Sequence, residues 1–553
     1  MKTMVTLALL LLTLSGFTQT PVWEWARTAS TMNHSGGSWI TTDQVGNAYI
    51  TGAFTQDMIL GTDTFFYMGS FPDVFLAKYN SSGNILWARS IGSEWDDRIG
   101  NPSIDDGGNV YISGDFRGSS VIIGSDTLLN QGPVPLTTDI FVVKYGPDGN
   151  VLWVRTAGSP GSESGSSTAT DGSGNLYITG WFSNPVISFD SINLHSVGSP
   201  SSVNMFLTKY DDMGNVLWAR AAGGTHGVLC YGTATDLHGN IYLTGSFLGN
   251  SVTFGPVTLY SSHTGFSIFL AKYDPSGNVV WAQSFGGGIH DVGLNVATDQ
   301  SGNVYITGAF SDSTLSLGSF VLNNTGLANV YLAKLDPAGN VLWAKSTGGT
   351  FRDSPWGLFV DETGGVYITV DSRSPSITFG NTTLNNLNPI NTHDLIIMKY
   401  DSLGNECWAT SFGGLHGSVA GDISVSATGN LYIAGGYSTP ELVLGSDTLT
   451  TTAASSRFFV AKASGFTGVE SIRHPEYEIS LSPNPMRDHV TVQVPTSIAD
   501  LTFCLYDIYG RKVISQKITG TTRLMVSHLP AGIYMYRLQY PGGRQTGKLV
   551  KIH

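Results

Sequence analysis

A tryptophan recurs along this chain at intervals of 62 to 66 residues, and a tyrosine follows each copy 24 residues later. A lysine stands nine residues before six of the seven tryptophans. The tryptophans are Trp25, Trp87, Trp153, Trp218, Trp281, Trp343 and Trp408; the tyrosines are Tyr49, Tyr111, Tyr177, Tyr242, Tyr305, Tyr367 and Tyr432; the lysines are Lys78, Lys144, Lys209, Lys272, Lys334 and Lys399. A period of this length predicts one supersecondary unit that is copied seven times and buries its apolar faces by stacking on its neighbours.

Each copy contains four short runs that are rich in β-branched and aromatic residues and are bounded by glycine, asparagine, aspartate and proline. In one copy these runs are 278–284, 293–299, 302–310 and 330–336. The runs lack 3.6-residue periodicity, so the pattern predicts strands rather than helices. Four strands in each of seven copies predict an all-β fold, a seven-bladed β-propeller with four-stranded blades.

The two ends of the repeat array complement each other. Trp25 has no lysine nine residues before it, and a further lysine, Lys462, has no tryptophan after it. The segment Val22–Thr28 matches the run that closes each copy, and the last copy stops after 458–462. We therefore expect the N-terminal strand to close the last blade, because such closure hides a sheet edge that would otherwise be free to aggregate.

The turns repeat an Asp-x-x-Gly-Asn phrase, as in Asp274–Asn278. The aspartate can cap the turn and the glycine supplies a positive φ, so hairpin chemistry explains the phrase. Calcium binding is the alternative for such aspartate-rich loops, but the full series of EF-hand ligands is absent from the sequence.

All variation in repeat length falls between the tyrosine and the next lysine. A Phe-Gly-x-x-x-Leu phrase there, as in Phe254–Leu259, predicts a small hairpin at the blade margin.

Composition and charge restrict the class of protein and its partners. The chain has 553 residues, of which 68 are glycine and 12% are charged, which favours an all-β protein with many tight turns. The net charge of −13 argues against a nucleic-acid partner or an anionic membrane, since both require a basic surface. The three cysteines, Cys230, Cys407 and Cys504, lie far apart and are interpreted as small packing residues rather than a disulfide framework.

The N-terminus has the features of a secretory signal. Lys2 supplies a positive charge, the run from Val5 to Leu14 is apolar, and small or polar residues follow. About ten apolar residues are too few to span a bilayer. The expected domains are a signal peptide at 1–19, the propeller at 20–464, a linker at 465–476 and a C-terminal β-sandwich at 477–553.

The repeats resemble the SBBP repeat, a β-propeller repeat of bacterial secreted proteins. The phrases that carry the resemblance are GNVYITG at 302–308, VYLAKLDPAGNVLWA at 330–344 and FLAKYDPSGNVVWA at 269–282. The resemblance covers about 440 residues and implies the propeller fold. It implies no activity, because propellers support many functions.

The C-terminal segment has a different pattern. It contains Leu481-Ser-Pro-Asn-Pro485, Tyr-Gly-Arg at 509–511, Leu-Pro-Ala-Gly-Ile-Tyr at 529–534 and Lys-Leu-Val-Lys at 548–551. With these phrases in this order, it resembles the type A sorting domain of type IX secretion in Bacteroidetes. The motif residues are Pro483, Asn484, Pro485, Gly510, Gly532, Tyr534, Lys548 and Lys551. The resemblance implies the type IX machinery as a partner, translocation across the outer membrane, and release or attachment at the cell surface. The alternative is an ordinary accessory sandwich.

Candidate functional residues are those that break the repeat, since a catalytic centre does not need seven equivalents. They gather in the loop after each tryptophan, which is expected to ring one mouth of the central channel. We predict a ligand site formed by His34, Trp39, Trp95, Asp96, Asp97, His226, His290, Asp291, Arg352, Asp353, Trp356 and His416. Aromatic rings beside carboxylates are suited to sugar or peptide recognition. The alternatives are a hydrated polar rim and extra packing between blades.

Three functional hypotheses remain from the sequence. The first is an exported, non-catalytic propeller that binds a glycan or a protein at the channel mouth, as in adhesion. The second is a polysaccharide- or peptide-acting hydrolase or lyase that uses the His/Asp rim. The sequence contains no nucleophile elbow, P-loop, dinucleotide fingerprint or zinc motif, so we predict no catalytic residues, no cofactor and no metal. A purely structural display scaffold is a third possibility.

Overall fold

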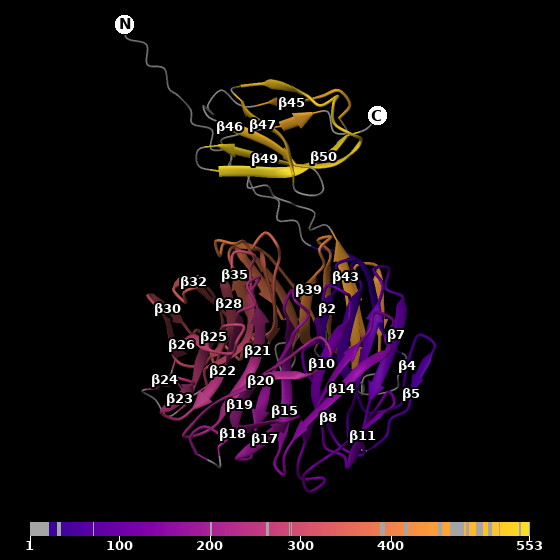
Figure 1. Cartoon of the computed structure of the whole chain (residues 1–553), viewed down its shortest axis with the longest axis vertical. Coiled ribbons are helices and arrows are strands. Elements are labelled where there is room, and N and C mark those ends of the chain that lie inside the picture. Colours follow the sequence, from indigo (N-terminus) through magenta and orange to yellow (C-terminus); the bar gives the residue numbers. More distant parts are fainter. Residues whose placement is uncertain are drawn as a thin grey trace. The chain divides into compact units, whose positions relative to one another are not determined.

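The computed structural model describes residues 21–551 except for 30–34, 70, 200–201, 262–264, 287, 289, 387–392, 414–417, 452–455, 465–479, 483–485, 494–500, 507–510, 519 and 541–542. The chain divides into two compact units, Met1–Phe466 (unit 1) and Thr467–His553 (unit 2) (Figure 1). All regular structure among the described residues is β-strand, and that part of the chain offers no helix able to cross a bilayer. The predicted signal peptide and the predicted linker lie outside the described residues.

The described part of unit 1 forms seven antiparallel sheets with four strand positions each. Sheet 1 contains β2 (Ser35–Thr42), β3 (Ala48–Phe54), β6 (Asp73–Tyr79) and β7 (Ile85–Ile91). Sheet 2 contains β8 (Asp97–Ile99) with β9 (Ser103–Ile104) at the first position, then β10 (Val110–Phe116), β13 (Asp139–Tyr145) and β14 (Val151–Gly158). Sheet 3 contains β15 (Glu163–Thr170), β16 (Leu176–Phe182), β19 (Asn204–Tyr210) and β20 (Val216–Gly224).

The remaining sheets repeat this order. Sheet 4 contains β21 (Val228–Thr235), β22 (Ile241–Leu248), β25 (Phe266–Tyr273) and β26 (Val279–Gly286). Sheet 5 contains β27 (Val292–Thr298), β28 (Val304–Phe310), β31 (Asn329–Leu335) and β32 (Val341–Thr347). Sheet 6 contains β33 (Asp353–Val360), β34 (Val366–Ser372), β37 (Asp394–Tyr400) and β38 (Glu406–Phe412). Sheet 7 contains β39 (Ser418–Val425), β40 (Leu431–Tyr437), β43 (Arg457–Ser464) and, from the other end of the repeat array, β1 (Val22–Thr28).

The N-terminal strand β1 runs antiparallel to β43 and occupies the fourth position of sheet 7. Lys462 lies opposite Trp25 in this pair, the same pairing that Lys78 and Trp87 make in sheet 1. The predicted pairing of the first strand with the last repeat is therefore present. It places two segments more than 400 residues apart in the chain next to each other.

A two-stranded hairpin follows the second strand of every sheet in the described part of unit 1. The hairpins are β4 (Met58–Leu60) with β5 (Asp63–Phe65), β11 (Ser120–Ile123) with β12 (Asp126–Leu129), β17 (Val186–Phe189) with β18 (Ile192–His195), β23 (Ser251–Phe254) with β24 (Val257–Tyr260), β29 (Thr314–Leu317) with β30 (Phe320–Asn323), β35 (Ser376–Phe379) with β36 (Thr382–Asn385), and β41 (Glu441–Leu444) with β42 (Asp447–Thr450). The hairpins β23–β24 and β35–β36 contain the Phe-Gly-x-x-x-Leu phrase, and the other five contain variants of it. The prediction of a hairpin in this segment is confirmed.

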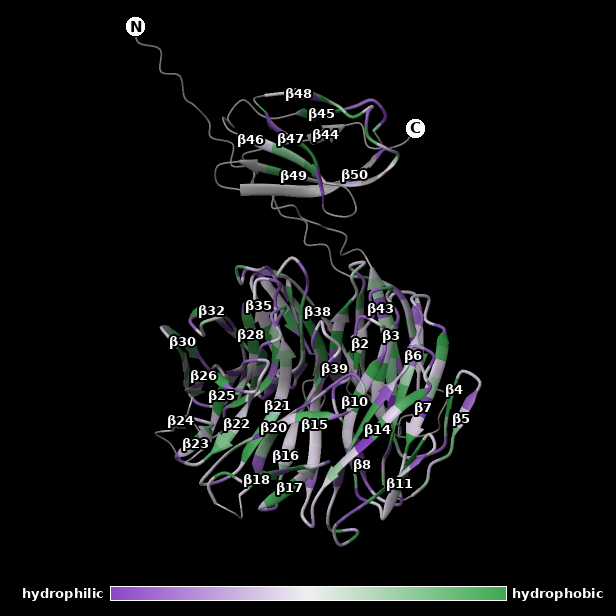
Figure 2. Ribbon diagram, viewed as in Figure 1, coloured by the Kyte–Doolittle hydropathy of each residue, from purple (hydrophilic) through white to green (hydrophobic). Residues whose placement is uncertain are grey.

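The second and third strands of each sheet are buried on both faces because neighbouring sheets stack against them. The buried residues form a separate cluster between each pair of consecutive sheets, and Figure 2 shows apolar residues running along the strands. A further cluster joins Ile50 and Phe75 of sheet 1 to Tyr432 and Phe458 of sheet 7. The first and last sheets thus share a core as the other neighbours do.

The repeated tyrosine, lysine and tryptophan lie side by side across three strands of one sheet. In sheet 1, Tyr49 of β3 is opposite Lys78 of β6, which is opposite Trp87 of β7. The Lys78 ammonium lies 4.8 Å from the centre of the Tyr49 ring and 3.9 Å from Asp43 Oδ2. Cation–π attraction and the carboxylate compensate for the removal of this charge from water.

The lysine and the tryptophan then bind the next sheet together. In sheet 1, Lys78 Nζ and Trp87 Nε1 both donate to the carbonyl oxygen of Pro147, at 3.0 Å and 2.9 Å. Five other pairs share one carbonyl of the following sheet in the same way: Lys144 and Trp153 with Asp212, Lys209 and Trp218 with Pro275, Lys272 and Trp281 with Pro337, Lys334 and Trp343 with Ser402, and Lys462 and Trp25 with Ser81. The last pair links sheet 7 to sheet 1.

The glycine of the accepting turn is required by this contact. Gly149 has a φ of +78° and lies beneath the Trp87 ring, where an added Cβ would come within 2.6 Å of the indole. A larger residue would therefore be strained in its backbone and would displace the tryptophan.

The aspartate of each Asp-x-x-Gly-Asn turn forms hydrogen bonds within the same turn. In one copy, Asp274 Oδ1 accepts from the backbone N–H groups of Ser276 and Asn278. These bonds account for the repeated aspartate without a metal ion.

Unit 2 contains two antiparallel sheets in its described part. One contains β44 (Ser480–Ser482), β45 (His489–Gln493) and β48 (Thr522–Met525), and the other contains β46 (Leu501–Tyr506), β47 (Lys512–Ile518), β49 (Gly532–Tyr540) and β50 (Gly543–Lys551). Side chains from both sheets, including Val490, Phe503 and Leu538, form one buried core. This arrangement fits the predicted sandwich.

The closing strand gives the first testable prediction. Trp25 is 5% exposed and packs in the core between sheets 7 and 1, so we expect Trp25→Ala to lower the free energy of unfolding by about 3–5 kcal/mol. Leu86→Ala is the control, because Leu86 is 51% exposed and should change stability by less than about 0.5 kcal/mol. Urea unfolding followed by fluorescence measures both. Equal stability of the two variants would show that β1 is dispensable.

Candidate functional site

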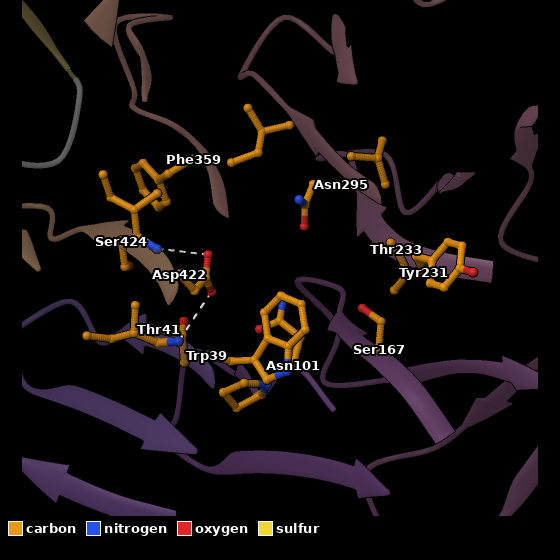
Figure 3. Close-up of a pocket in the computed structure, with 16 residues that line it drawn as sticks. Trp39, Thr41, Asn101, Ser167, Tyr231, Thr233, Asn295, Phe359, Asp422 and Ser424 are labelled. Atoms are coloured by element: carbon orange, nitrogen blue, oxygen red, sulfur yellow. Dashed lines mark hydrogen bonds between the residues drawn. The ribbon is translucent and has the colours of Figure 1, made fainter. Parts of the chain in front are cut away.

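The first strands of all seven sheets surround one cavity of about 140 Å³. Its lining includes Trp39 of β2, Ser167 of β15, Tyr231 of β21, Asn295 of β27 and Asp422 of β39, and Figure 3 shows side chains from these strands around one central space. Sheet 2 contributes Asn101 and Pro102, and sheet 6 contributes Leu358 and Phe359. Each sheet therefore presents its first strand to this space.

A break in strand pairing directs these residues into the cavity. The first strand of six sheets changes register against the second strand between Gly37 and Trp39, Gly165 and Ser167, Cys230 and Gly232, Gly293 and Asn295, Pro355 and Leu358, and Ala420 and Ile423. In sheet 2 the strand is interrupted at the same place, so that β8 and β9 pair separately with β10. Bulges of this kind change the direction of side chains and are frequent next to binding sites.

One sequence position marks this break in every copy. It stands 14 residues after the repeat tryptophan and is held by Trp39, Asn101, Ser167, Gly232, Asn295, Gly357 and Asp422. We call it the cavity position. Six of its members line the cavity; at the seventh, Gly357, the next residue lines it instead. The cavity position differs in chemistry from copy to copy, whereas the tryptophan, tyrosine and lysine do not.

One tryptophan lines the cavity and a second packs against it. Trp39 is part of the lining, and the ring of Trp356, which is not, lies with its centroid 6.5 Å from that of Trp39 and its plane tilted by 53°. Trp356 is 37% exposed, and its carbonyl oxygen accepts a hydrogen bond of 2.9 Å from Asn295 Nδ2. This bond fixes the Asn295 amide next to the tryptophan pair. Apart from one carboxyl group, the polar lining consists of amides and hydroxyls, including Asn101, Ser167 and Thr233.

Asp422 is the one carboxyl group among the described residues that line the cavity. Its Oδ1 accepts from the backbone N–H of Ile423 at 2.8 Å, and its Oδ2 accepts from Ile40 at 3.2 Å (Figure 3). Burial raises the pKa of Asp422 to about 7, because the charged form loses its hydration. The same described lining contains no histidine, cysteine, lysine or arginine.

The predicted acidic residues of the loops occupy a different environment. Asp97, Asp291 and Asp353 are at most 2% exposed and bind their own loops: Ser93 N donates to Asp97 at 2.6 Å, Gly288 N to Asp291 at 3.1 Å, and Gly349 N to Asp353 at 2.7 Å. Glu163 occupies the equivalent position in sheet 3. None of these carboxyls lines the cavity. They fix the course of the loops that precede the first strands.

The other predicted site residues lie on the surface of the loops or outside the described residues. Trp95 stacks on Phe71 with ring centres 5.2 Å apart, and Asp96 pairs with Arg98 at 3.1 Å. Three further loop residues are exposed: His226, His290 and Arg352. His34 and His416 fall outside the described residues. Of the twelve predicted residues, Trp39 lines the cavity, and the structure brings Trp356 into contact with its ring.

The residues that the sequence analysis missed share a detectable signal. Asn101, Ser167, Asn295 and Asp422 lie on the second run of their copies, which was read as an ordinary strand, and all stand 14 residues after the tryptophan. Aligning the seven copies on the tryptophan would have exposed this variable position. For metals, no group of three or more His, Cys, Asp or Glu side chains is suitably placed among the described residues.

The predicted sorting motif is partly described in unit 2. Tyr534 is 5% exposed and donates a hydrogen bond of 2.8 Å from its hydroxyl to the carbonyl oxygen of Pro530. Lys551 is 8% exposed at the end of β50, and both Gly532 and Lys548 lie in the paired strands β49 and β50. Pro483, Asn484, Pro485 and Gly510 are outside the described residues.

Comparison with protein families identifies this second unit. Residues 480–552 match the secretion system C-terminal sorting domain. The match indicates export by the type IX secretion system to the cell surface or beyond, and handling of the chain by that machinery.

Unit 1 has more distant relatives. The chain is 25% identical over 472 residues to an uncharacterized WD repeat-containing protein of Acanthamoeba polyphaga mimivirus, covering 70% of this chain and 34% of that protein. It is 26% identical over 260 residues to the regulatory protein FlaEY of Caulobacter vibrioides, covering 44% of this chain and 26% of that protein. The chain therefore spans about a third or less of the length of these relatives.

Solved structures give weaker likenesses. PorZ, an essential surface component of the type IX secretion system of Porphyromonas gingivalis, is 11% identical with a TM-score of 0.22, covering 94% of this chain and 81% of that chain. A puromycin hydrolase mutant complexed with PGG is 10% identical with a TM-score of 0.39, covering 84% and 59%. At these TM-scores neither structure bears on the function of this chain.

The buried carboxyls predict how stability depends on pH. Burial raises the pKa of Asp97 and of Glu163 to about 8. A carboxyl whose pKa is raised by folding stabilises the fold fully below its unfolded pKa of ~4, and this contribution is lost as the pH rises toward 8. We therefore expect the free energy of unfolding to fall between pH 5 and pH 8, by up to ~1.4 kcal/mol per pH unit for each such group.

Asp97→Asn should make this decline shallower, because the amide can keep the bonds to Ser93 without titrating. Asp96→Asn, the neighbouring surface position paired with Arg98, is the matched control and should retain the wild-type slope. Urea unfolding at half-unit pH steps measures the effect. Stability that increases across this window would contradict the assignment of these carboxyls as neutral, buried groups.

Proposed function

We propose that this chain is an exported, non-catalytic binding protein whose seven sheets are the blades of a closed β-propeller of SBBP-type repeats. In this proposal the propeller spans residues 20–464, the sorting sandwich spans 477–553, and residues 1–19 are removed as a signal peptide. The ligand occupies the central cavity and is a glycan or a protein surface outside the cell, as in adhesion.

The contacts of sheet 7 support closure. Its core is shared with sheet 1, and Lys462, Trp25 and Tyr432 all donate to carbonyl groups of sheet 1. The lysine–tryptophan pairs of sheets 1 to 5 bind the following sheet in the same way. An array with free ends would leave the polar groups of its terminal sheets without such partners.

The observation that carries the binding proposal is the convergence of six cavity positions on one space, with Leu358 taking the place of Gly357 in sheet 6. The residues that build the sheets are constant from copy to copy, while tryptophan, asparagine, serine, glycine and aspartate alternate at the positions that face the cavity. Close packing accounts for Gly232, where an added Cβ would lie 2.9 Å from the carbonyl oxygen of Leu294. A ligand that touches each sheet differently accounts for the variety at the other positions.

The lining favours binding over catalysis. General acid–base chemistry uses a pair of groups with different proton affinities, and nucleophilic chemistry uses a nucleophile next to a base. The cavity offers Asp422 as its single carboxyl among the described lining residues. Amides, hydroxyls and indole rings instead supply hydrogen bonds and apolar surface, which suit recognition.

Export is tested by removing the sorting unit. We expect a chain that ends at residue 476 to accumulate in the periplasm, while the full-length chain reaches the cell surface or the medium. Immunoblots of cell fractions distinguish these locations. A full chain with Leu86→Ala serves as the control for the effects of mutation on folding. Normal appearance of the truncated chain outside the cell would contradict the proposal.

Binding is tested by glycan arrays and by pull-down from surface extracts. We expect ligands retained by the wild type to be lost by Trp39→Ala, because Trp39 forms part of the cavity wall. Trp95→Ala is the matched control, since Trp95 stacks on Phe71 outside the cavity. Ligands that survive Trp39→Ala would place binding elsewhere. Hydrolysis of a polysaccharide or peptide that is lost in His290→Ala or Asp291→Ala would instead establish the catalytic alternative.

A further inference from the structure

We propose that the central cavity receives one neutral sugar ring at the end of a glycan, with the Trp39 ring as an apolar wall and Asp422 as an acceptor for its hydroxyl groups. This inference rests on the proposed binding function and names the chemical class of the ligand. It is carried by the size of the cavity, its tryptophan wall, its hydrogen-bonding groups and its charge.

The size of the cavity limits the ligand to one small ring. Its volume of about 140 Å³ is several times the ~30 Å³ that one water molecule occupies in the liquid. It is smaller than the ~300–1,000 Å³ pockets that enclose drug-sized ligands. A peptide segment or an oligosaccharide would not fit inside, whereas one terminal ring can enter while the rest of the glycan stays outside.

Trp39 offers an apolar surface to such a ring, because its side chain lines the cavity. Trp356 packs against Trp39 from outside the lining, with ring centroids 6.5 Å apart and planes tilted by 53°, so the two rings do not cover each other as a parallel stack would. A sugar ring has apolar C–H groups on its face and hydroxyls on its rim, which matches an indole wall next to polar groups.

The hydrogen-bonding capacity of Asp422 is only partly used. A carboxylate has about four acceptor sites, and Asp422 uses one on each oxygen for the backbone N–H groups of Ile423 and Ile40. Asn295 donates to the carbonyl of Trp356, which fixes its amide at the wall. Sugar hydroxyls can therefore donate to Asp422 and exchange hydrogen bonds with the surrounding amides and hydroxyls.

The charge of the lining excludes acidic sugars. Burying a carboxylate ligand requires a cationic partner, and the described lining has neither lysine nor arginine. Asp422 in its charged form would repel such a ligand. Tyr231 is the other titratable group of the lining, and burial raises its pKa, so it remains neutral at physiological pH. The lining thus selects for a neutral ring.

The proposal is tested by titrating the full chain with glucose, galactose, mannose and N-acetylglucosamine at pH 8. Glucuronate and tetramethylammonium are the charged probes, because a uronic acid tests anion rejection and the ammonium tests an aromatic cation cage. Tryptophan fluorescence and isothermal titration calorimetry measure binding. We expect at least one neutral sugar to bind saturably, and neither charged probe to compete with it.

Variants locate the binding. Trp39→Ala should weaken the neutral sugar ~10-fold or more, and Asp422→Asn should weaken it ~10–100-fold, as expected for loss of a hydrogen bond to a charged group. Trp95→Ala should bind like the wild type. Thermal melting establishes that each variant is folded.

The possible outcomes separate this inference from the proposed function. If none of the neutral sugars binds, or if a charged probe binds equally well, the sugar inference is wrong. If the sugar binds but Trp39→Ala and Asp422→Asn leave its affinity unchanged, the cavity is not its site. A protein or another glycan whose capture is lost in Trp39→Ala would preserve the binding function while overturning the sugar assignment. Failure of every ligand screen would remove both.

Discussion

The sheets of unit 1 are connected by a hydrogen-bonding arrangement in which one backbone carbonyl receives two donors from the preceding sheet. A lysine ammonium and an indole N–H reach the same turn, as Lys78 and Trp87 reach Pro147. The lysine is buried, so its charge requires the tyrosine ring beneath it and the nearby aspartate. If the tyrosine or the aspartate were removed, the buried lysine would lose a contact that compensates for the loss of its hydration.

This arrangement explains why three residue types are constant along the array. Each is held in register across neighbouring strands, and each contacts a fixed atom of its own or the next sheet. The turn glycine is equally constrained, because the indole lies directly over it. The frame built in this way leaves one variable position per copy at the bulge of the first strand, although close packing restricts Gly232 and Gly357 there, where an added Cβ would lie within 2.9 Å and 2.6 Å of neighbouring atoms. Variation concentrated there changes the cavity without disturbing the sheets.

The loops before the first strands serve the frame rather than the cavity. Their acidic side chains turn inward and bind backbone N–H groups of the same loop, and burial raises the pKa of Asp97 and Glu163 to about 8. A neutral carboxyl can fill such a position without a cationic partner. The net charge of −13 counts every aspartate and glutamate of the chain as ionised. Because these buried loop carboxyls hold their protons near neutral pH, the actual charge of the chain is less negative than this.

Periodicity made much of the fold predictable. The repeat of Trp25 and its equivalents indicated seven like units, the strand runs indicated four strands in each, and the unmatched Lys462 indicated the partner of β1. The candidate site was less predictable. Trp39 and Trp356 were predicted as site residues because they break the repeat. Asn101, Asn295 and Asp422 were not predicted, because a bulge results from the pairing of two strands and is not visible in one run of residues.

The sequence by itself determined which residues are structural and which segments pair, because the repeat and the strand propensity of each run are visible in the order of the residues. It also determined the sorting unit, whose motif is a linear phrase. Only the tertiary structure decided which way the variable side chains face. Asp97 and Asp422 have the same chemistry, yet one closes a loop and the other lines the cavity, since burial and the direction of a side chain depend on strands that are distant in sequence.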